Sequence, residues 1–213
     1  MTRKGWPIGK LFEFAVFVSA IGVIGNAYWN RVPEGVVRVP KTDWARLLDG
    51  GLDLSAPPDP AITIVEFIDY QCPACAQLEP FLAALDTEHT GRIRRVIRHF
   101  PIRQLHPDAE RGAHAIVCAS KQGRGTPLHS HLLSNQKALT SLRPDTLVRS
   151  IELDSALYTS CLHAEETHKK VADDIALGTL LGVTGTPTIV IDGLWLSTPS
   201  PQLIRSLVEA RLR

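Results

Sequence analysis

Apolar and polar positions along the chain alternate in two distinct ways, which predict strands and helices in a definite order. The β-branched run AITIVEFID at 61–69 predicts a buried strand, and the segment after it predicts a helix through about residue 89. A second strand is expected at 92–100, RIRRVIRHF, with one face in water. If the intervening helix is a crossover, these two strands are parallel.

Helical spacing and capping residues dominate the middle of the chain. Helices are expected at 106–122, 127–136, 143–153, 154–162 and 163–182. Near the end, 186–191 and 194–197 flank an Asp-Gly turn and predict a hairpin. The amphipathic segment 200–213 predicts a closing helix.

The N-terminal 29 residues have the pattern of a membrane segment. A basic flank precedes the apolar run at 11–29, whose nineteen residues would form a helix of roughly 28 Å, against about 30 Å of hydrocarbon. We therefore expect 1–29 to be a signal anchor or a cleaved signal peptide. The basic flank would stay in the cytoplasm and the rest would be periplasmic or extracellular, where disulfides persist.

Residues 30–60 contain five prolines and predict a tether with one short helix at 42–51, capped by Thr42. Overall charge is close to balanced, with 23 basic and 22 acidic residues, so the chain has no long-range attraction to nucleic acid. The basic stretch at 92–99 is therefore interpreted as part of a strand.

The segment QCPACAQLEP at 71–80 carries the strongest chemical signal. If Cys72 is the N-cap of the following helix, Pro73 occupies the first helical position, which favours proline. The partial positive charge of a helix start would then stabilise a thiolate on Cys72 and lower its pKa. Cys75 lies one turn further along. This predicts Cys72 as the nucleophile and Cys75 as the resolving thiol.

A zinc site is the main alternative for these cysteines. Its four ligands would be Cys72, Cys75, Cys118 and Cys161, but the last two are isolated, whereas structural zinc sites usually bring two close pairs. A redox pair that needs no metal or cofactor is favoured. A non-catalytic module that binds zinc or a partner protein stays open as an alternative.

Two other positions are candidates for the same site. Glu66 shares its strand face with Ile62, Ile64 and Ile68, which predicts apolar surroundings and a raised pKa, unless it lies at a strand end and reaches water. Pro187 opens an apolar strand, a place where proline is unusual. Because most X–Pro bonds are trans, the frequency alone predicts a trans Thr186–Pro187 bond.

Three motifs, VEFIDYQCPAC, HFPIRQLHPDAERGA and GVTGTPTIVIDG, resemble in their order those of the DsbA-like family of exported thiol–disulfide oxidoreductases. The resemblance covers roughly residues 60–212. It implies an α/β thioredoxin-like fold over 61–105 and 183–213, with an inserted α-helical domain at 106–182, preceded here by the N-terminal membrane or signal helix.

The same resemblance implies roles for individual residues. Glu66 would be a buried acid that relays a proton to or from Cys75. Thr186-Pro187 would form a cis-proline loop opposite the cysteines, and the Thr186 backbone would pair with an extended substrate. Ala74 offers no charge or donor to the thiolate, which implies a redox potential short of the oxidising extreme.

Cys118 and Cys161 match places where some family members carry a second cystine, which implies a structural disulfide rather than two buried free thiols. The partners implied are unfolded or client proteins with thiols or disulfides, and a membrane redox protein. A reductase dedicated to one client, such as cytochrome or copper-site assembly, is the alternative within this class.

Overall fold

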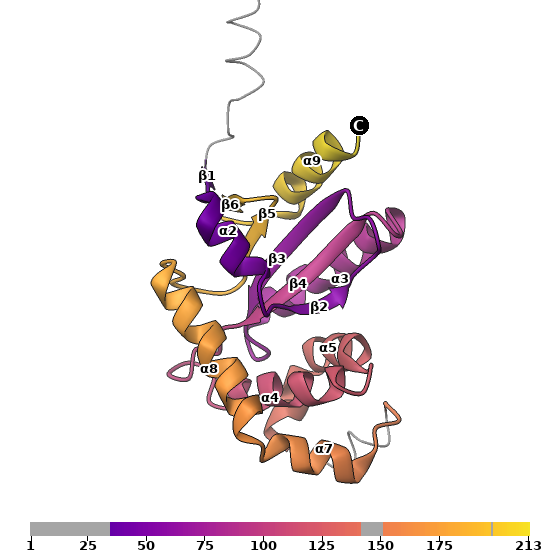
Figure 1. Cartoon of the computed structure of the whole chain (residues 1–213), viewed down its shortest axis with the longest axis vertical. Helices are drawn as coiled ribbons and strands as arrows, with labels where there is room; N and C mark the ends of the chain where they lie inside the picture. The colour runs from indigo at the N-terminus through magenta and orange to yellow at the C-terminus, as the bar shows by residue number, and fades with distance from the viewer. Residues whose placement is uncertain (1–34, 142–150, 197) are drawn as a thin grey trace, which may run out of the picture. The chain divides into compact units, whose positions relative to one another are not determined.

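A mixed β-sheet organises the chain in the computed structural model, which describes residues 35–141, 151–196 and 198–213 (Figure 1). Within these residues six strands pair in the order β1-β6-β5-β3-β4-β2. They are β1 (Val36–Arg38), β2 (Leu52–Ser55), β3 (Ile62–Ile68), β4 (Ile93–His99), β5 (Thr188–Ile191) and β6 (Leu194–Leu196). The expected parallel pairing of β3 with β4 and the antiparallel β5–β6 hairpin are both confirmed.

Helices pack on the sheet and also form the insertion between β4 and β5. They are α2 (Lys41–Leu48), α3 (Pro73–Glu88), α4 (Ala109–Ser120), α5 (Gly125–Ser134), α7 (Ser155–Leu162), α8 (Glu165–Leu180) and α9 (Pro201–Leu212), with a 3-10 turn, η1 (Gln136–Ser141). The helix expected at 143–153 falls largely outside the described residues. The other helices predicted from the apolar spacing are present.

Side chains of β3 point alternately to two helical layers. Val65 and Phe67 pack with Leu47 of α2 and Leu177 of α8 on one face. Glu66 lies on the opposite face, where α3 supplies its neighbours. Nearly every position of β3 is buried, as expected for a central strand. The thioredoxin-like α/β fold is therefore confirmed.

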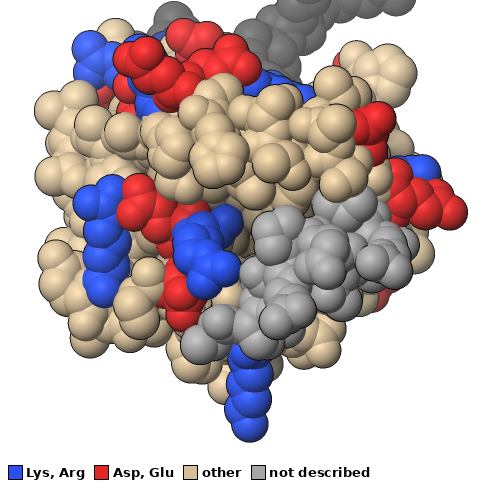
Figure 2. Space-filling model, turned by 90° about the horizontal axis from the view of Figure 1, so that it is seen from below, with Lys and Arg blue, Asp and Glu red and all other residues tan. Residues whose placement is uncertain are grey.

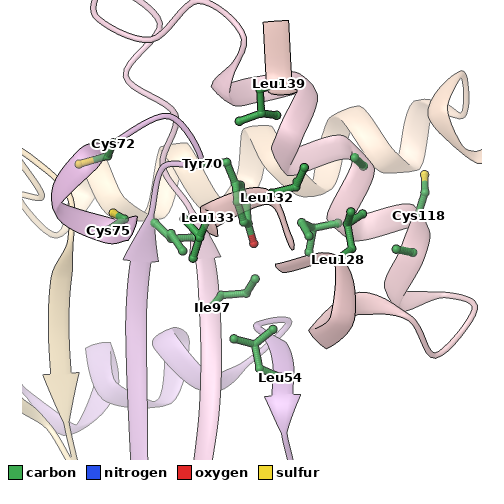
Figure 3. Packing of buried hydrophobic residues seen from close by; sticks show 14 of the residues in the cluster. Leu54, Tyr70, Cys72, Cys75, Ile97, Cys118, Leu128, Leu132, Leu133 and Leu139 are labelled. Carbon is green, nitrogen blue, oxygen red and sulfur yellow. The ribbon is translucent and has the colours of Figure 1, made fainter. Parts of the chain in front are cut away.

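One hydrophobic cluster joins the carboxyl end of β3 to the inserted helices. Ile97 of β4 and Tyr70, which follows β3, pack with Leu128 and Leu132 of α5, and both Cys72 and Cys75 belong to the same cluster (Figure 3). Residues 37–213 accordingly form one compact unit. The loop that carries the cysteine pair thus shares its core with the insertion.

The expectation that 30–60 is a tether is wrong for its described part. This segment supplies β1 and β2, the two outer strands of the sheet, together with α2, whose Leu47 is fully buried. The short outer strands tolerate flanking prolines, which made the segment resemble a linker. The predicted cap is also wrong, because α2 begins at Lys41, with Pro40 as its N-cap residue, and Thr42 lies inside it.

Strand β4 does not have the water-facing side that its three arginines suggested. It lies between β3 and β2, and both faces are buried. Arg98 tolerates burial because it donates to Asp174 Oδ1 at 2.8 Å and to backbone carbonyls at the end of α2, including Leu47 O at 3.0 Å. Arg95 is buried on the opposite face against carboxylates. Internal ion pairs account for these buried arginines.

Charge on the surface is mixed. On the face drawn in Figure 2, lysines and arginines lie beside aspartates and glutamates among uncharged residues. Among the described residues, Lys121 pairs with Glu166 and Arg124 pairs with Glu152 at the surface. No helix within the described ranges is long and apolar enough to cross a membrane. The expected membrane or signal segment, 1–29, lies outside them.

Candidate active site

The two cysteines lie where β3 gives way to α3. Cys72 is the N-cap residue of this helix and Pro73 is at its first position, as the sequence predicted. The Cys72 peptide N–H donates to the Asp69 carbonyl at 3.1 Å, which fixes the turn into the helix. Both thiols are free; Cys75 is fully buried, whereas Cys72 retains 7% of its accessible surface. The outer thiol is therefore the one that another protein can reach.

The pKa values of the two thiols are shifted in opposite directions. A hydrogen bond from the Cys75 thiol and the backbone amides of Cys75 and Ala74 lower the pKa of Cys72 from 9.0 to about 5, against the effect of partial burial. The pKa of Cys75 is raised well above its ordinary value, because it hydrogen-bonds Cys72 and because it is buried near Glu66. At neutral pH Cys72 is a thiolate and Cys75 keeps its proton.

The loop before β5 lies against the outer thiol. The Thr186–Pro187 peptide bond is cis, the isomer that the family resemblance implied. The Cys72 Sγ lies 3.2 Å from the Thr186 carbonyl oxygen, which can accept a hydrogen bond from Cys72 only when the thiol is protonated. The Thr188 hydroxyl donates to the Gly185 carbonyl at 2.8 Å and holds this loop closed. The structure thus places Thr186 against Cys72.

Glu66 is buried beneath the cysteines, with 3% of its surface accessible. Its Oε2 atom has no hydrogen-bond partner among the residues that the structure describes. Burial raises the pKa of Glu66 to about 8, and the charge of Arg95, whose Nη2 is 4.0 Å from Oε2, opposes this rise. The interpretation of Glu66 as a strand-end residue that reaches water is wrong. At neutral pH its carboxyl is mostly protonated.

Four further residues of the site were missed from the sequence. Arg95 Nη1 and Nη2 contact Glu79 Oε1 and Oε2 at 3.1 and 2.5 Å. His129 Nε2 lies 3.0 Å from Glu79 Oε2, and its Nδ1 lies 3.0 Å from the Tyr70 hydroxyl. Although burial opposes it, contact with His129 and Arg95 lowers the pKa of Glu79 to about 2. The sequence partly indicated Glu79, because it follows Cys75 by four residues and so lies one helical turn away on the same face.

Asp69 holds the cysteine loop to the segment after β4. Its Oδ1 accepts the Gln71 N–H at 2.8 Å, and its Oδ2 accepts the Ile102 N–H at 2.8 Å and lies 2.8 Å from His106 Nδ1. From the insertion, Gln136 Nε2 donates to the Cys72 carbonyl at 2.8 Å. These bonds explain why the motif around residue 106 accompanies the cysteine motif in the sequence.

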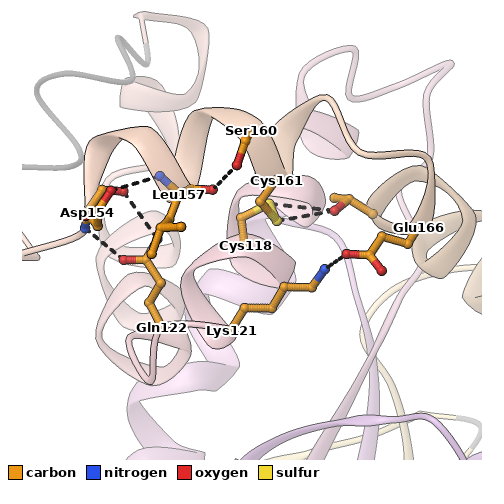
Figure 4. The surroundings of a disulfide bond; sticks show 9 residues. Cys118, Lys121, Gln122, Asp154, Leu157, Ser160, Cys161 and Glu166 are labelled. Atoms are coloured by element: carbon orange, nitrogen blue, oxygen red, sulfur yellow. Dashed lines mark hydrogen bonds and ion pairs between the residues drawn. A yellow bond between two sulfur atoms is a disulfide. The ribbon is translucent and has the colours of Figure 1, made fainter.

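Cys118 and Cys161 form a disulfide that joins α4 to α7 (Figure 4), which confirms the implied pairing. The Thr167 hydroxyl lies 3.8 Å from one sulfur and 3.3 Å from the other. The bond removes two of the four ligands that a zinc site would need. In Figure 3, Cys118 lies across the hydrophobic cluster from Cys72 and Cys75. In the described part of the chain, no group of three or more histidines, cysteines and acids could hold a metal ion.

A thiolate at a helix start can attack a disulfide in another protein, and a protonated neighbour one turn away can resolve the product. A thioredoxin-like sheet followed by a helix that carries such a pair of thiols is typical of the thioredoxin-fold thiol–disulfide oxidoreductases. The chain belongs to the thioredoxin family, because the family model described as Thioredoxin matches residues 57–210.

Solved structures share this fold at low sequence identity. A thioredoxin-like oxidoreductase from Silicibacter pomeroyi is 24% identical, with a TM-score of 0.65 over 82% of this chain and 99% of that chain. The thiol-disulfide exchange protein alpha-DsbA2 from Wolbachia pipientis is 21% identical, with a TM-score of 0.64 over 80% of this chain and 94% of that chain. The fold is therefore of the DsbA type.

A curated relative is a much longer protein. The Na(+)/H(+) antiporter NhaA 3 of Salinispora tropica is 31% identical in an alignment 185 positions long, which covers 78% of this chain and 28% of the antiporter. This chain therefore matches about a quarter of that relative.

Proposed function

We propose that this chain exchanges disulfides with client proteins through Cys72 and Cys75 on the extracytoplasmic side of a membrane. The observation that carries the proposal is the placement of the two thiols: Cys72 is the N-cap residue of α3 and reaches the surface, whereas Cys75 is buried one turn further along. Their pKa values are shifted in opposite directions, which suits one to be nucleophile and leaving group and the other to be the resolving thiol. Insulin reduction and refolding of a reduced client test it. A wild-type protein that accelerates neither reaction contradicts the proposal.

In the oxidising direction, a client thiolate attacks Cys72 of the enzyme disulfide. The Cys72–Cys75 bond breaks, Cys75 leaves with the electron pair, and it takes a proton from Glu66. A second client thiolate then attacks the client sulfur of the mixed disulfide and releases Cys72 as a thiolate. The client loses two electrons and two protons; one proton replaces that given by Glu66 and the other goes to solvent. Reduction is the reverse.

The loop at Thr186-Pro187 is the proposed binding site for the client chain. Its backbone lies 3.2 Å from the Cys72 sulfur, so an extended segment paired with it would place its own cysteine near that sulfur. Main-chain pairing recognises an extended polypeptide with little regard to its side chains. Broad client selection follows from this geometry.

The N-terminal segment 1–29 is proposed to hold the domain at the membrane, and a membrane protein is proposed as its redox partner. The match to part of a Na(+)/H(+) antiporter supports a setting beside membrane proteins. The persistence of a second disulfide, Cys118–Cys161, fits an oxidising compartment.

Replacing Glu66 by glutamine is expected to slow catalysed exchange by up to about 100-fold, because a glutamine side chain cannot give a proton to Cys75 or take one from it. The variant should also unfold less easily. The folded pKa of about 8 lies above the ordinary 4.5, so the folded state binds more protons and ionisation of Glu66 costs stability as the pH rises between these values.

Insulin reduction at several pH values and denaturant unfolding measure the two effects of Glu66→Gln. The gain in the free energy of unfolding should grow from pH 4.5 to about 8. An exchange rate equal to that of the wild type across pH 5–8 would remove Glu66 from the mechanism.

A further inference from the structure

A buried aspartate and a partly exposed histidine form a pair beside the two cysteines. Asp69 directly follows β3 and keeps 1% of its accessible surface. His106 lies in the segment between β4 and α4, and its Nδ1 is 2.8 Å from Asp69 Oδ2. The histidine side chain keeps 18% of its surface, so solvent reaches part of the ring. The proton relay through Glu66 uses neither residue of this pair.

The carboxylate determines which ring nitrogen of His106 carries the hydrogen. Asp69 accepts from the Gln71 N–H on Oδ1 and from the Ile102 N–H on Oδ2, both at 2.8 Å. Because an ionised carboxylate can only accept, the neutral ring places its hydrogen on Nδ1 and donates to Asp69. The other nitrogen, Nε2, is then the basic one. Among the described residues it has no hydrogen-bond partner and is not buried, so it is open to a bound client.

The same aspartate holds the histidine beside the outer thiol. The Asp69 backbone carbonyl accepts the Cys72 N–H at 3.1 Å, while the Asp69 side chain binds His106. A second link joins the two loops, because the Asp108 N–H donates to Gln71 Oε1 at 2.6 Å. The loop that carries His106 therefore borders the place where a client cysteine reacts with Cys72.

We propose that His106 is a catalytic residue: in the oxidising direction, its Nε2 accepts the proton of a client thiol as that thiol attacks Cys72. The inference rests on the proposed function, because it concerns the client thiol that this function consumes. Asp69 is the positioning residue of the pair, since it orients the ring and stabilises the charge that the ring gains.

The chemistry of disulfide exchange needs such a base. Only a thiolate attacks a sulfur atom, and an ordinary cysteine, with a pKa of about 8.5, is ionised to roughly a few per cent at neutral pH. Cys72 needs no base, because it lies at the start of α3. A client cysteine in an extended segment has no helix start to stabilise its thiolate, so its proton must be removed by another group.

The protons and electrons balance in each step. As the first client thiol attacks, its proton moves to Nε2 of His106, a bond forms between the client sulfur and Cys72, and the Cys72–Cys75 bond breaks with its electron pair on Cys75. Cys75 takes its proton from Glu66, and His106 releases its proton. A second client thiol gives its proton to Nε2 and attacks the client sulfur, and Cys72 leaves as a thiolate. Of the two client protons, one restores Glu66 and the other enters solvent.

His106→Gln in the oxidised full-length protein tests the proposal. A glutamine N–H can still donate to Asp69, but the side chain cannot take a proton. The measurement is the rate at which a small thiol reduces the Cys72–Cys75 disulfide near neutral pH, followed by acid quench and alkylation. An alkyl thiol that is mostly protonated should react about 10-fold or more slowly with the variant than with the wild type. An acidic aromatic thiol that is already ionised should react at the wild-type rate.

A control variant and an equilibrium measurement separate catalysis from a change in loop structure. His163→Gln makes the same substitution at an exposed position at the end of α7, and it should match the wild type with both thiols. A base speeds both directions equally, so the glutathione equilibrium of His106→Gln should equal that of the wild type. The proposal is overturned by no slowing with the alkyl thiol, by equal slowing with both thiols, or by slowing that accompanies a shifted equilibrium.

If His106→Gln fails to fold, the wild-type protein carries the test. Its disulfide should react faster than oxidised glutathione by a larger factor with the alkyl thiol than with the aromatic thiol, because only the protonated thiol needs a base. Equal factors overturn the proposal. A failure of the proposed function appears elsewhere, as a wild-type chain that accelerates neither insulin reduction nor refolding of a reduced client.

Discussion

Replacing Cys72 by serine is expected to reduce catalysed disulfide exchange to the uncatalysed rate. Cys72 combines access from solvent with a pKa of about 5, whereas Cys75 is buried and protonated. A serine hydroxyl does not ionise near neutral pH and cannot form a mixed disulfide. Insulin reduction and refolding of a reduced client should both stop, while the fold, measured by circular dichroism, should stay intact.

Cys75→Ser is the matched comparison, because it removes the second sulfur and leaves the nucleophile. This variant should attack a client disulfide but fail to resolve the product, so that a mixed disulfide with Cys72 accumulates on a non-reducing gel. The trapped protein also identifies the client or the proposed membrane partner. Exchange by Cys72→Ser at the wild-type rate, or no trapped species with Cys75→Ser, contradicts the assigned roles.

The largest expected effect on stability comes from the second disulfide. Changing both Cys118 and Cys161 to serine should lower the free energy of unfolding by about 4 kcal/mol, since the bond closes a loop with a sequence separation of 43 in the unfolded chain. Loop closure restricts the unfolded ensemble more strongly as the loop grows. Denaturant unfolding of the variant and the wild type, at one fixed redox state of Cys72 and Cys75, measures the difference.

Ser160→Ala is the control for this change, because Ser160 is exposed beside Cys161 on α7 and its loss should change stability by about 0.5 kcal/mol or less (Figure 4). Exchange activity of the doubly substituted protein should persist at temperatures where it is folded, since the bond lies away from the redox pair. A loss of about 1 kcal/mol or less, or an inactive folded variant, would contradict the purely structural role.

How far the fold could be predicted depended on where each element lies. The central strand β3 carries a nearly continuous apolar run and the helices carry an apolar stripe, because they are covered on one or both sides. The outer strands β1 and β2 are short and lie among prolines, and nothing local in 30–60 shows that they pair with the sheet. Arg95 and Arg98 looked exposed because their partners, Glu79 and Asp174, are 16 and 76 positions away.

The same distinction applies to the site. Cys72, Pro73 and Cys75 could be assigned because helix capping is a local property that a few neighbouring residues determine. The roles of Asp69 and His129 depend on contacts with segments far along the chain, at 102–106 and at Glu79. Composition and spacing carry no record of such contacts.

Catalysis by this chain depends on a Cys72 thiol that ionises well below neutral pH, and a titration of that thiol measures this property. Thiolate formation in the reduced protein can be followed by ultraviolet absorbance, with Cys72→Ser identifying the signal. We expect a midpoint near pH 5, with the fold unchanged across the titration. A midpoint at the ordinary thiol value of 9.0 would contradict it, because Cys72 would then be neither an activated nucleophile nor a good leaving group.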